Sequence, residues 1–519
     1  MASQDITSLN PECNSGHSLN RLWIYITLSS GMILSWFPLF GQRLPFADDY
    51  AIMHIIDKGG LIGYFHVWGF WRPLGHILPI WLLLKHPFYT PWLVLLTHMA
   101  GVLLLFELNR TLFGGIRLPL VAALAFAMLP FGFQAMAWTC TFNYIAPTTL
   151  LLANLLILAN YDKVRLPLPL LFGVIVLLSV LTNLASEICF FTTAFSGCLI
   201  WVLSHETQWS LKKLFHGKNS LAFAPVTGCI IWYTMFSLCM RPDVPKHITN
   251  LHWASILSPY VKERSMFDAF SAWSSPVCRE FLFYDWDWRT FACASLCCFF
   301  FLIGLSRLSQ SSDTTSEVRQ NASRFLFGLI ALLLGSSLIY VFNGGFSPDS
   351  RKKYPLIPIL ALAGCFIYRS LFNRLKLHGR VFFLVTAVVL ASGALTVWLV
   401  LGIWKYQTDC YNTLADFIAN HNLKGPLEIK WSPDFFAAWP KMGETLGYRF
   451  DDDININYAV EYRGGCPVVI KSKKIEIVRF NTSNVGYSAQ VMTNGYEMVL
   501  TNAVTVICHD ANKNTWRIQ

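Results

Sequence analysis

The chain has 519 residues, of which 54% are hydrophobic, 15% are aromatic and 13% are charged. Because a soluble domain usually carries about 25% charged residues, this composition excludes an ordinary soluble enzyme as well as a disordered or fibrous chain. The net charge of +10 falls on loops between apolar segments, which is typical of a membrane protein rather than of a nucleic-acid-binding protein. Apolar runs close to the ~20 residues that cross a bilayer recur along the chain, so the sequence predicts a polytopic membrane protein.

The predicted elements start with a polar cytoplasmic segment, residues 1–21, and a first span that is retained rather than cleaved as a signal peptide. Residues 73–84 are apolar over only about twelve positions, a length that favours a helix at the membrane surface over a crossing. With 73–84 on the outer side, the basic residues of alternate loops, from Arg110 to Arg380, all face the cytoplasm. In chain order, the predicted spans are then 22–40, 92–108, 118–133, 144–158, 166–184, 188–203, 221–240, 291–305, 325–342, 356–372 and 381–404.

We therefore predict a mainly α fold, a transmembrane helical bundle of about 11 spans over residues 22–404. Its outer face carries loops 41–91, 241–288 and 343–354. Residues 405–519 form an outer tail, which we predict to be a small mixed α/β domain. In this tail, 411–420 has helical spacing, 427–431 and 475–480 alternate like strands, and Asn494-Gly495 is typical of a hairpin turn.

Two adjacent carboxylates, Asp48 and Asp49, follow the first span. Like charges side by side are costly to desolvate at a membrane surface. The pair could bind a divalent cation, Mg²⁺ or Mn²⁺, or one member could act as general base on a hydroxyl. An exposed acidic turn is the alternative. The sequence contains no Gly-rich phosphate loop, so we expect no nucleotide site and no cofactor beyond such a cation.

Further candidates lie in or near the outer loops. Arg72 stands at the depth of lipid headgroups, where a guanidinium binds phosphate oxygens or anchors the chain to lipid. His66 is nearby. Trp138 and Asn143 combine an aromatic ring with an amide, which suits sugar recognition, although an interfacial aromatic belt also fits the tryptophan. Glu187 lies between two apolar runs, which is costly unless it faces a cavity or a partner.

A cationic run precedes the tenth predicted span. Arg351, Lys352 and Lys353 are consecutive and Tyr354 follows them. Cations on the outer side go against the positive-inside bias. An anionic ligand at the membrane surface, such as a lipid phosphate, explains them, and so does general contact with anionic lipid.

Taken in this order, the candidate residues resemble those of the integral-membrane glycosyltransferases of the GT-C superfamily. This superfamily includes protein O-mannosyltransferases, aminoarabinose transferases and enzymes that glucosylate O-antigen. The resemblance covers roughly residues 20–405. It is carried by Asp48-Asp49, Trp71-Arg72-Pro73-Leu74, Leu129-Pro130 with the run from Gln134 to Trp138, Ser186-Glu187, and Arg351 with Tyr354-Pro355.

The resemblance implies a hexosyltransferase whose donor is one sugar on a polyprenyl phosphate, such as undecaprenyl phosphate. The acceptor would be a hydroxyl of a surface polysaccharide such as lipopolysaccharide O-antigen, and membrane lipid but no nucleic acid would be a partner. The active site would lie on the outer face of the inner (plasma) membrane, which makes the tail periplasmic. A single displacement would invert the anomeric carbon.

The roles of the candidate residues follow from the same resemblance. Asp48 or Asp49 would be the catalytic base, and their pairing leaves a metal site open. The leaving phosphate would bind Arg72, Arg351, Lys352, Lys353 and Tyr354. The substrates would contact His66, Trp138, Asn143 and Glu187.

Two other functions remain open. A transporter or flippase for a lipid-linked glycan predicts internal repeats and charges at mid-membrane depth, and neither is visible in the sequence. An O-antigen polymerase or ligase would use the same membrane face and a polyprenyl substrate. It would centre on a large basic outer loop, for which 241–288 is a modest candidate.

Overall fold

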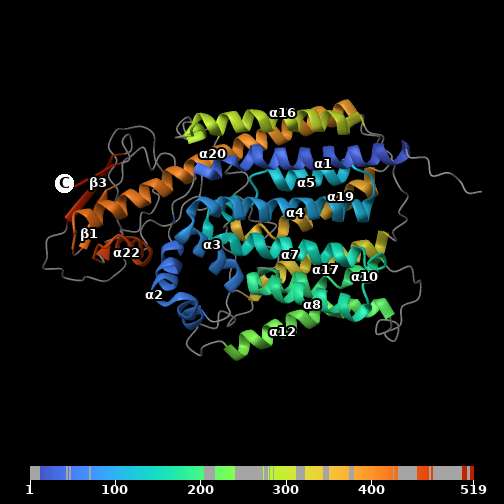
Figure 1. The fold of residues 1–519 in the computed structure, drawn as a ribbon, viewed down its shortest axis with the longest axis horizontal. Helices are drawn as coiled ribbons and strands as arrows, with labels where there is room; N and C mark the ends of the chain where they lie inside the picture. The colour runs from blue at the N-terminus through green and yellow to red at the C-terminus, as the bar shows by residue number, and fades with distance from the viewer. Residues whose placement is uncertain are drawn as a thin grey trace, which may run out of the picture.

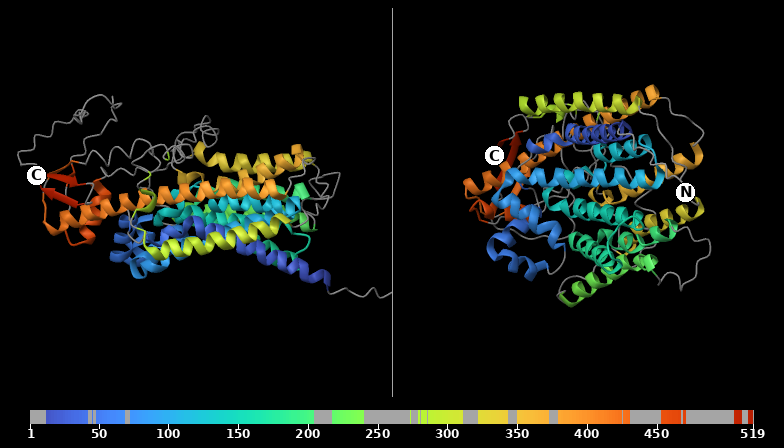
Figure 2. Two further views of the ribbon diagram at one scale, coloured as in Figure 1. Left: turned by 90° about the horizontal axis from the view of Figure 1, so that it is seen from above. Right: turned by 45° about the vertical axis from the view of Figure 1, so that its right-hand side comes forward.

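The protein is described here by a computed structural model, in which most of the helical body and parts of the tail are placed. The described residues are 12–41, 45, 48–68, 72–203, 217–239, 273, 279, 281–284, 286–310, 322–342, 350–372, 379–424, 426–430, 453–466, 469–470, 505–510 and 515–518. Most of the helices run side by side in one elongated bundle (Figure 1). The tail lies beyond one end of this bundle (Figure 2).

The helices of the first half are α1 (Glu12–Trp36), η1 (Phe37–Gly41), α2 (Asp48–Trp68), α3 (Pro73–Lys85), η2 (Pro87–Tyr89), α4 (Thr90–Phe113), α5 (Arg117–Met128), α6 (Phe133–Ala137), η3 (Thr139–Thr141), α7 (Phe142–Ala159), α8 (Leu168–Ala185), η4 (Glu187–Cys189), α9 (Phe190–Phe195) and α10 (Cys198–Leu203). Those of the second half are η5 (Gly217–Phe223), α12 (Ala224–Cys239), η8 (Phe281–Phe283), α16 (Trp288–Gln310), α17 (Ala322–Phe342), α18 (Ser350–Lys353), α19 (Leu356–Phe372), α20 (Gly379–Asn420) and α22 (Asp453–Tyr462).

The described residues contain seven helices that are long and apolar enough to cross a membrane. A helical membrane-embedded body is therefore confirmed. Shorter apolar helices complete the bundle, and among them α5 packs against α4, whereas α17 packs against α9, α10 and α19. The predicted number of spans stays a prediction. The seven long segments are Arg21–Phe40, Pro87–Phe113, Thr139–Ala159, Leu168–Ala185, Gly217–Leu238, Trp288–Leu308 and Phe383–Asn420.

Small residues bring neighbouring helices close together, as is common in membrane bundles. A Cβ added to Gly304 of α16 would come 2.1 Å from Oγ1 of Thr27 on α1. A Cβ added to Gly228 of α12 would come 2.5 Å from Cβ of Ser179 on α8. Larger side chains at these two glycines would push the helices apart.

Two elements depart from the bundle direction. Helix α2 crosses the end of the bundle, and its direction changes at Gly60, which has φ 57° and ψ −155° (Figure 1). Glycine adopts this positive φ without steric cost. Helix α3 follows and packs against α2, α7, α8 and η3. These two helices therefore close one end of the helical body.

Helix α20 is 42 residues long. At 1.5 Å per residue it measures about 63 Å, roughly twice the hydrocarbon thickness of a bilayer. The sequence placed a span at 381–404 and a separate helix at 411–420, but the structure joins them without a break. The carboxyl-terminal part of α20 leaves the bundle and packs against α22 (Figure 2).

A four-stranded sheet lies in the tail, in the order β2-β1-β3-β4. Strand β1 (Pro426–Lys430) pairs in parallel with β2 (Val469–Ile470) and with β3 (Thr505–Asp510), whereas β4 (Thr515–Ile518) is antiparallel to β3. Strand β1 covers most of the predicted strand 427–431. The predicted strand 475–480 and the turn Asn494-Gly495 lie outside the described residues.

Candidate functional site

The acidic pair opens helix α2. Asp48 and Asp49 are the first two residues of this helix, where the helix dipole favours negative charge. Asp49 is 1% exposed, and its Oδ1 accepts a hydrogen bond from the backbone N–H of Cys140 at 2.7 Å. Asp48 is half-buried. The start of α2 is therefore tied to residues 138–140, which we call the 138–140 segment and which joins α6 to α7.

A cation from the late part of the chain contacts the same segment. Arg351 lies in α18, and its Cζ is 4.6 Å from the centroid of the Trp138 ring, within the range of a cation–π contact. Trp138 is 2% exposed. The charges of Asp48, Asp49 and Arg351 all act on the side chain of Cys140. The structure thus brings the predicted acids and one predicted cation to a single short segment.

Helix α18 is followed by a buried tyrosine. Tyr354 is 1% exposed, and its hydroxyl is hydrogen-bonded to Nδ1 of His98 on α4. Gly132, which has φ 66°, lies so close to this ring that an added Cβ would come 2.8 Å from Tyr354 Cδ2. Lys353 is only 3% exposed. The side chain of Lys352 lies outside the described residues.

A second cluster forms around Arg72, the N-cap residue of α3, which has φ 54°. Its Nε donates to Oε2 of Glu187 at 2.8 Å, and its Nη2 donates to Oε1 of the same carboxylate. Burial lowers the pKa of Arg72, but the charge and hydrogen bonds of Glu187 more than offset this effect, so the net pKa is raised. The guanidinium therefore stays charged and joins α3 to η4. Two residues to which the sequence gave separate roles contact each other.

His76 lies one turn along α3. Its Nδ1 is 3.0 Å from the hydroxyl of Tyr64, and its Nε2 is 3.0 Å from Nδ2 of Asn143. Burial and the nearby charge of Arg72 lower the pKa of His76 to about 3, so the imidazole is neutral at pH 7. The neutral ring has one donor and one acceptor nitrogen, and Tyr64 and Asn143 each contact one of them.

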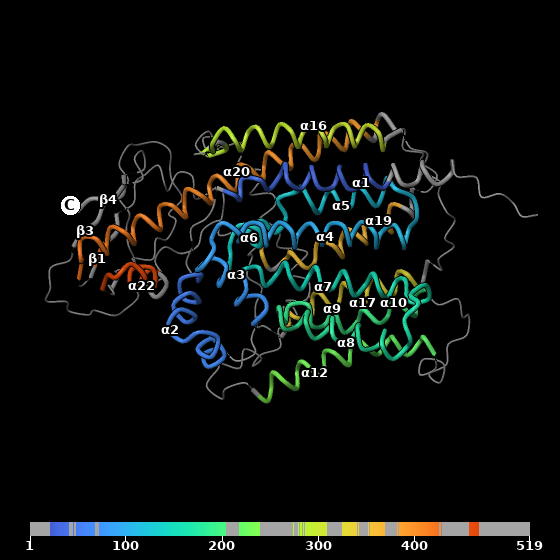
Figure 3. Tube along the Cα trace, in the orientation of Figure 1, coloured from blue at the N-terminus to red at the C-terminus, as the bar shows by residue number. Residues whose placement is uncertain are grey.

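The two clusters lie at the same end of the bundle, where Figure 3 shows α2, α3 and α6 together. Helix α3 packs directly against η3, the turn that contains Cys140. An added Cβ at Gly75 would come 2.4 Å from Cβ of Asn143 and from the carbonyl oxygen of Ala185, so α3 approaches α7 and α8 at backbone distance. His66 is exposed in the second half of α2, beyond Gly60.

The predicted cation site rests on Asp48 and Asp49. Within the part of the chain that the structure describes, no three His, Cys, Asp or Glu side chains gather into a metal centre. One oxygen of Asp49 is bonded to the Cys140 N–H. A Mg²⁺ or Mn²⁺ ion at this pair would take its other oxygen ligands from substrate or water, and the site stays a prediction.

Comparison with known proteins does not assign the chain to a family. No family model matches the chain, and no curated protein matches it. The sequence identified Trp138 and the cations of α18. It missed Cys140, His98, Tyr64 and the burial of His76, because each acts through partners that are distant in the chain.

Proposed function

We propose that this protein is an integral-membrane glycosyltransferase of the GT-C type, which moves one sugar from a polyprenyl phosphate to an acceptor hydroxyl on the outer face of the inner membrane. In this proposal the seven long helices and the four segments Arg117–Met128, Glu187–Leu203, Arg324–Ile339 and Leu356–Tyr368 cross the membrane. The short helix α3 then lies at the outer surface. The amino terminus is cytoplasmic and residues 405–519 form a periplasmic domain.

The proposal depends above all on one observation, the meeting of acid and cation at the 138–140 segment. Asp49 binds the backbone of Cys140, and Arg351 covers the ring of Trp138. A sugar phosphate bound here would have a carboxylate near the anomeric carbon and a cation near the phosphate. Sugar transfer needs both groups, because the acceptor hydroxyl must lose a proton and the departing phosphate must carry charge.

The chemistry divides between the two aspartates. Asp48 is the more exposed of the pair and takes the proton of the acceptor hydroxyl, while Asp49 is oriented by Cys140. The acceptor oxygen forms a bond to the anomeric carbon as the bond from that carbon to the phosphate oxygen breaks. Its electron pair leaves with the phosphate, and the anomeric carbon is inverted.

Arg351 and Lys353, together with Lys352, stabilise the departing phosphate. Arg72 and Glu187 neutralise each other and are assigned a different part, since their two hydrogen bonds hold α3 against η4. Trp138 and Asn143 lie on either side of Cys140 and line the sugar position in this proposal. The apolar polyprenyl chain adds binding energy in the bilayer without touching the reacting carbon.

The test replaces Asp48 by asparagine and follows surface glycans by mass spectrometry. Cells with the unaltered gene should show a gain of one sugar unit, and the D48N variant should lower transfer by roughly 10³-fold, as expected on loss of a general base. Asp57→Asn is the matched control, because Asp57 is an exposed acid on the same helix. Full transfer by D48N would reject the proposal, and a change in glycan chain length instead of mass per repeat would favour a polymerase.

The proposed topology has its own test in cysteine labelling of intact cells. Asp57 is exposed on α2, and Lys163 is exposed between α7 and α8. An impermeant thiol reagent should label the Asp57→Cys variant from outside, while the Lys163→Cys variant should react only after the membrane is opened. Labelling of both from the same side would contradict the assignment of α4, α5 and α7 as three spans.

A further inference from the structure

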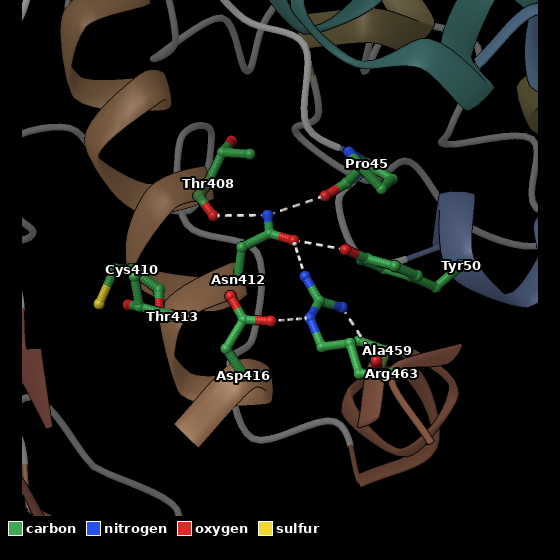
Figure 4. Close-up of polar contacts among 9 residues, drawn as sticks. All are labelled: Pro45, Tyr50, Thr408, Cys410, Asn412, Thr413, Asp416, Ala459 and Arg463. Atoms are coloured by element: carbon green, nitrogen blue, oxygen red, sulfur yellow. Dashed lines mark hydrogen bonds and ion pairs between the residues drawn. The ribbon is translucent and has the colours of Figure 1, made fainter. Parts of the chain in front are cut away.

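The extension of α20 beyond the bundle meets the start of α2 through one buried amide. Asn412 lies on α20 and is 2% exposed. Figure 4 shows it between the loop before α2, helix α2 and the end of α22. Its Nδ2 donates to the carbonyl oxygen of Pro45 at 3.0 Å and to that of Thr408 at 2.8 Å. Both amide hydrogens are thus used on the chain itself.

The amide oxygen of Asn412 accepts two further bonds. One comes from the hydroxyl of Tyr50, and the other comes from Nη2 of Arg463 at 2.6 Å. Burial raises the pKa of Tyr50 to about 12, so the hydroxyl keeps its proton and acts as donor at pH 7. With two donors and two acceptors around it, the amide has one orientation only.

Arg463 follows α22 and uses all three of its guanidinium nitrogens. Its Nε donates to Asp416, one turn beyond Asn412 on α20, and its Nη1 donates to the carbonyl oxygen of Ala459 at 2.9 Å. Its Cζ lies 5.1 Å from the centroid of the Tyr50 ring. The arginine therefore links the tail helix to α20 and to α2 at the same time (Figure 4).

We infer that Asn412 and Arg463 are positioning residues through which the C-terminal part of the chain fixes the first turn of α2. Pro45 and Tyr50 stand on either side of Asp48 and Asp49, and both are bonded to the same amide. Movement of the acidic pair away from Cys140 would require these bonds to break. The link from this network to sugar transfer rests on the proposed function, whereas the mechanical link does not.

The test measures hydrogen exchange of backbone amides in the purified full-length protein. The variant R463M keeps an unbranched apolar side chain and removes the bonds to Asn412 and Asp416. We expect amides 51–56 of α2 to exchange about tenfold faster than in the unaltered protein, because charge-assisted hydrogen bonds to a buried group are lost. Amides in α4 should not change.

The conservative variant R463K keeps the charge and should restore part of the protection. R289M is the matched control, because Arg289 is an exposed arginine whose guanidinium lies over Trp288 and not near α2. A second variant, N412D, keeps the shape of the side chain but replaces the donor to Pro45 by an acceptor. Unchanged exchange of α2 in both R463M and N412D would overturn the inference, as would equal acceleration of α2 and α4.

The same variants are then compared with D48N for transfer in cells, with glycan mass as the readout. Reduced transfer by R463M with recovery in R463K supports the link between network and active site. If exchange changes as expected while D48N transfers sugar normally, the mechanical role stands and the proposed function fails. If D48N is inactive while R463M keeps α2 protected, the proposed function stands and the positioning role fails.

Discussion

The two polar clusters at the end of the bundle use charge in different ways. Around α3, Arg72 and Glu187 touch each other through two hydrogen bonds, so the pair is neutral as a unit. Around α18, the cation and the acid both contact the 138–140 segment, Arg351 through the Trp138 ring and Asp49 through the backbone N–H of Cys140. The first arrangement joins two helices, whereas the second brings an acid and a cation to one short turn.

This difference implies that the α3 cluster serves mainly stability and the α18 cluster mainly catalysis. A neutralised pair that is largely buried holds its helices but has little charge left for a ligand, because each member already compensates the other. Arg351 lies over the Trp138 ring, and an aromatic ring does not neutralise a cation as a carboxylate does. We therefore expect substitutions in the α3 cluster to affect folding first and substitutions in the α18 cluster to affect transfer first.

The largest expected effect on stability comes from Glu187→Gln. This change leaves Arg72 charged and largely buried without its carboxylate, which should lower the free energy of unfolding by about 3 kcal/mol. In Arg351→Met, loss of the contact with the Trp138 ring should cost about 1 kcal/mol. Equilibrium unfolding of the full-length protein in mixed micelles measures both.

The loss of sugar transfer should be in the opposite order for the same two variants. Arg351→Met should reduce sugar transfer more than Glu187→Gln does, once each is corrected for the amount of folded protein in the membrane. Equal loss of stability in the two variants would remove the distinction between the clusters. If the Glu187→Gln variant folds fully but loses transfer, Glu187 would instead be a substrate-binding residue, as predicted from the sequence.

Part of this picture was accessible from the sequence because composition and spacing are local properties. The low charge content predicted a helical membrane body, and the structure confirms it. The sequence also singled out Asp48, Asp49, Trp138 and Arg351 one by one, since charged and aromatic residues next to apolar runs are costly and conspicuous. Their meeting at the 138–140 segment could not be derived, because residue spacing says nothing about which loops approach each other.

The break predicted after Trp404 shows why other features were missed. Lys405 and Asp409 interrupt the apolar run, so the sequence ended the span there. In the structure Lys405 is 8% exposed, with its Nζ 5.3 Å from the centroid of the Tyr284 ring and 5.6 Å from that of Trp286. Tertiary contacts of this kind allow one helix to continue through a polar stretch. They cannot be predicted from local hydropathy, because the contacting residues are distant in the chain.

The α3 cluster should make the folded protein sensitive to acid through His76. The pKa of His76 is about 3 in the folded protein and about 6.5 in an unfolded chain. Between these values the unfolded state binds the proton and the folded state does not, so stability falls as the pH falls through this window. We expect a loss of roughly 1.5 kcal/mol between pH 6.5 and pH 5 from this residue.

The variant His76→Gln cannot take up this proton and serves as the comparison. Its free energy of unfolding should be lower at pH 7, because the bonds to Tyr64 and Asn143 are disturbed. It should also vary less between pH 6.5 and pH 5 than that of the unaltered protein. Parallel pH profiles for the two proteins would show that His76 is protonated in the folded state.

The smallest effect tests whether the two clusters are independent. Tyr354→Phe removes the buried hydroxyl that is bonded to His98 and should lower the free energy of unfolding by about 1 kcal/mol. Its bond partner lies on α4, whereas Arg72 precedes α3 and Glu187 lies in η4. In the double variant with Glu187→Gln the two losses should therefore add to within about 0.5 kcal/mol. A coupling well above that value would mean that α3 and α18 move as one unit, because strain at one anchor would then reach the other through η3, and the separation of a structural cluster from a chemical one would have to be abandoned.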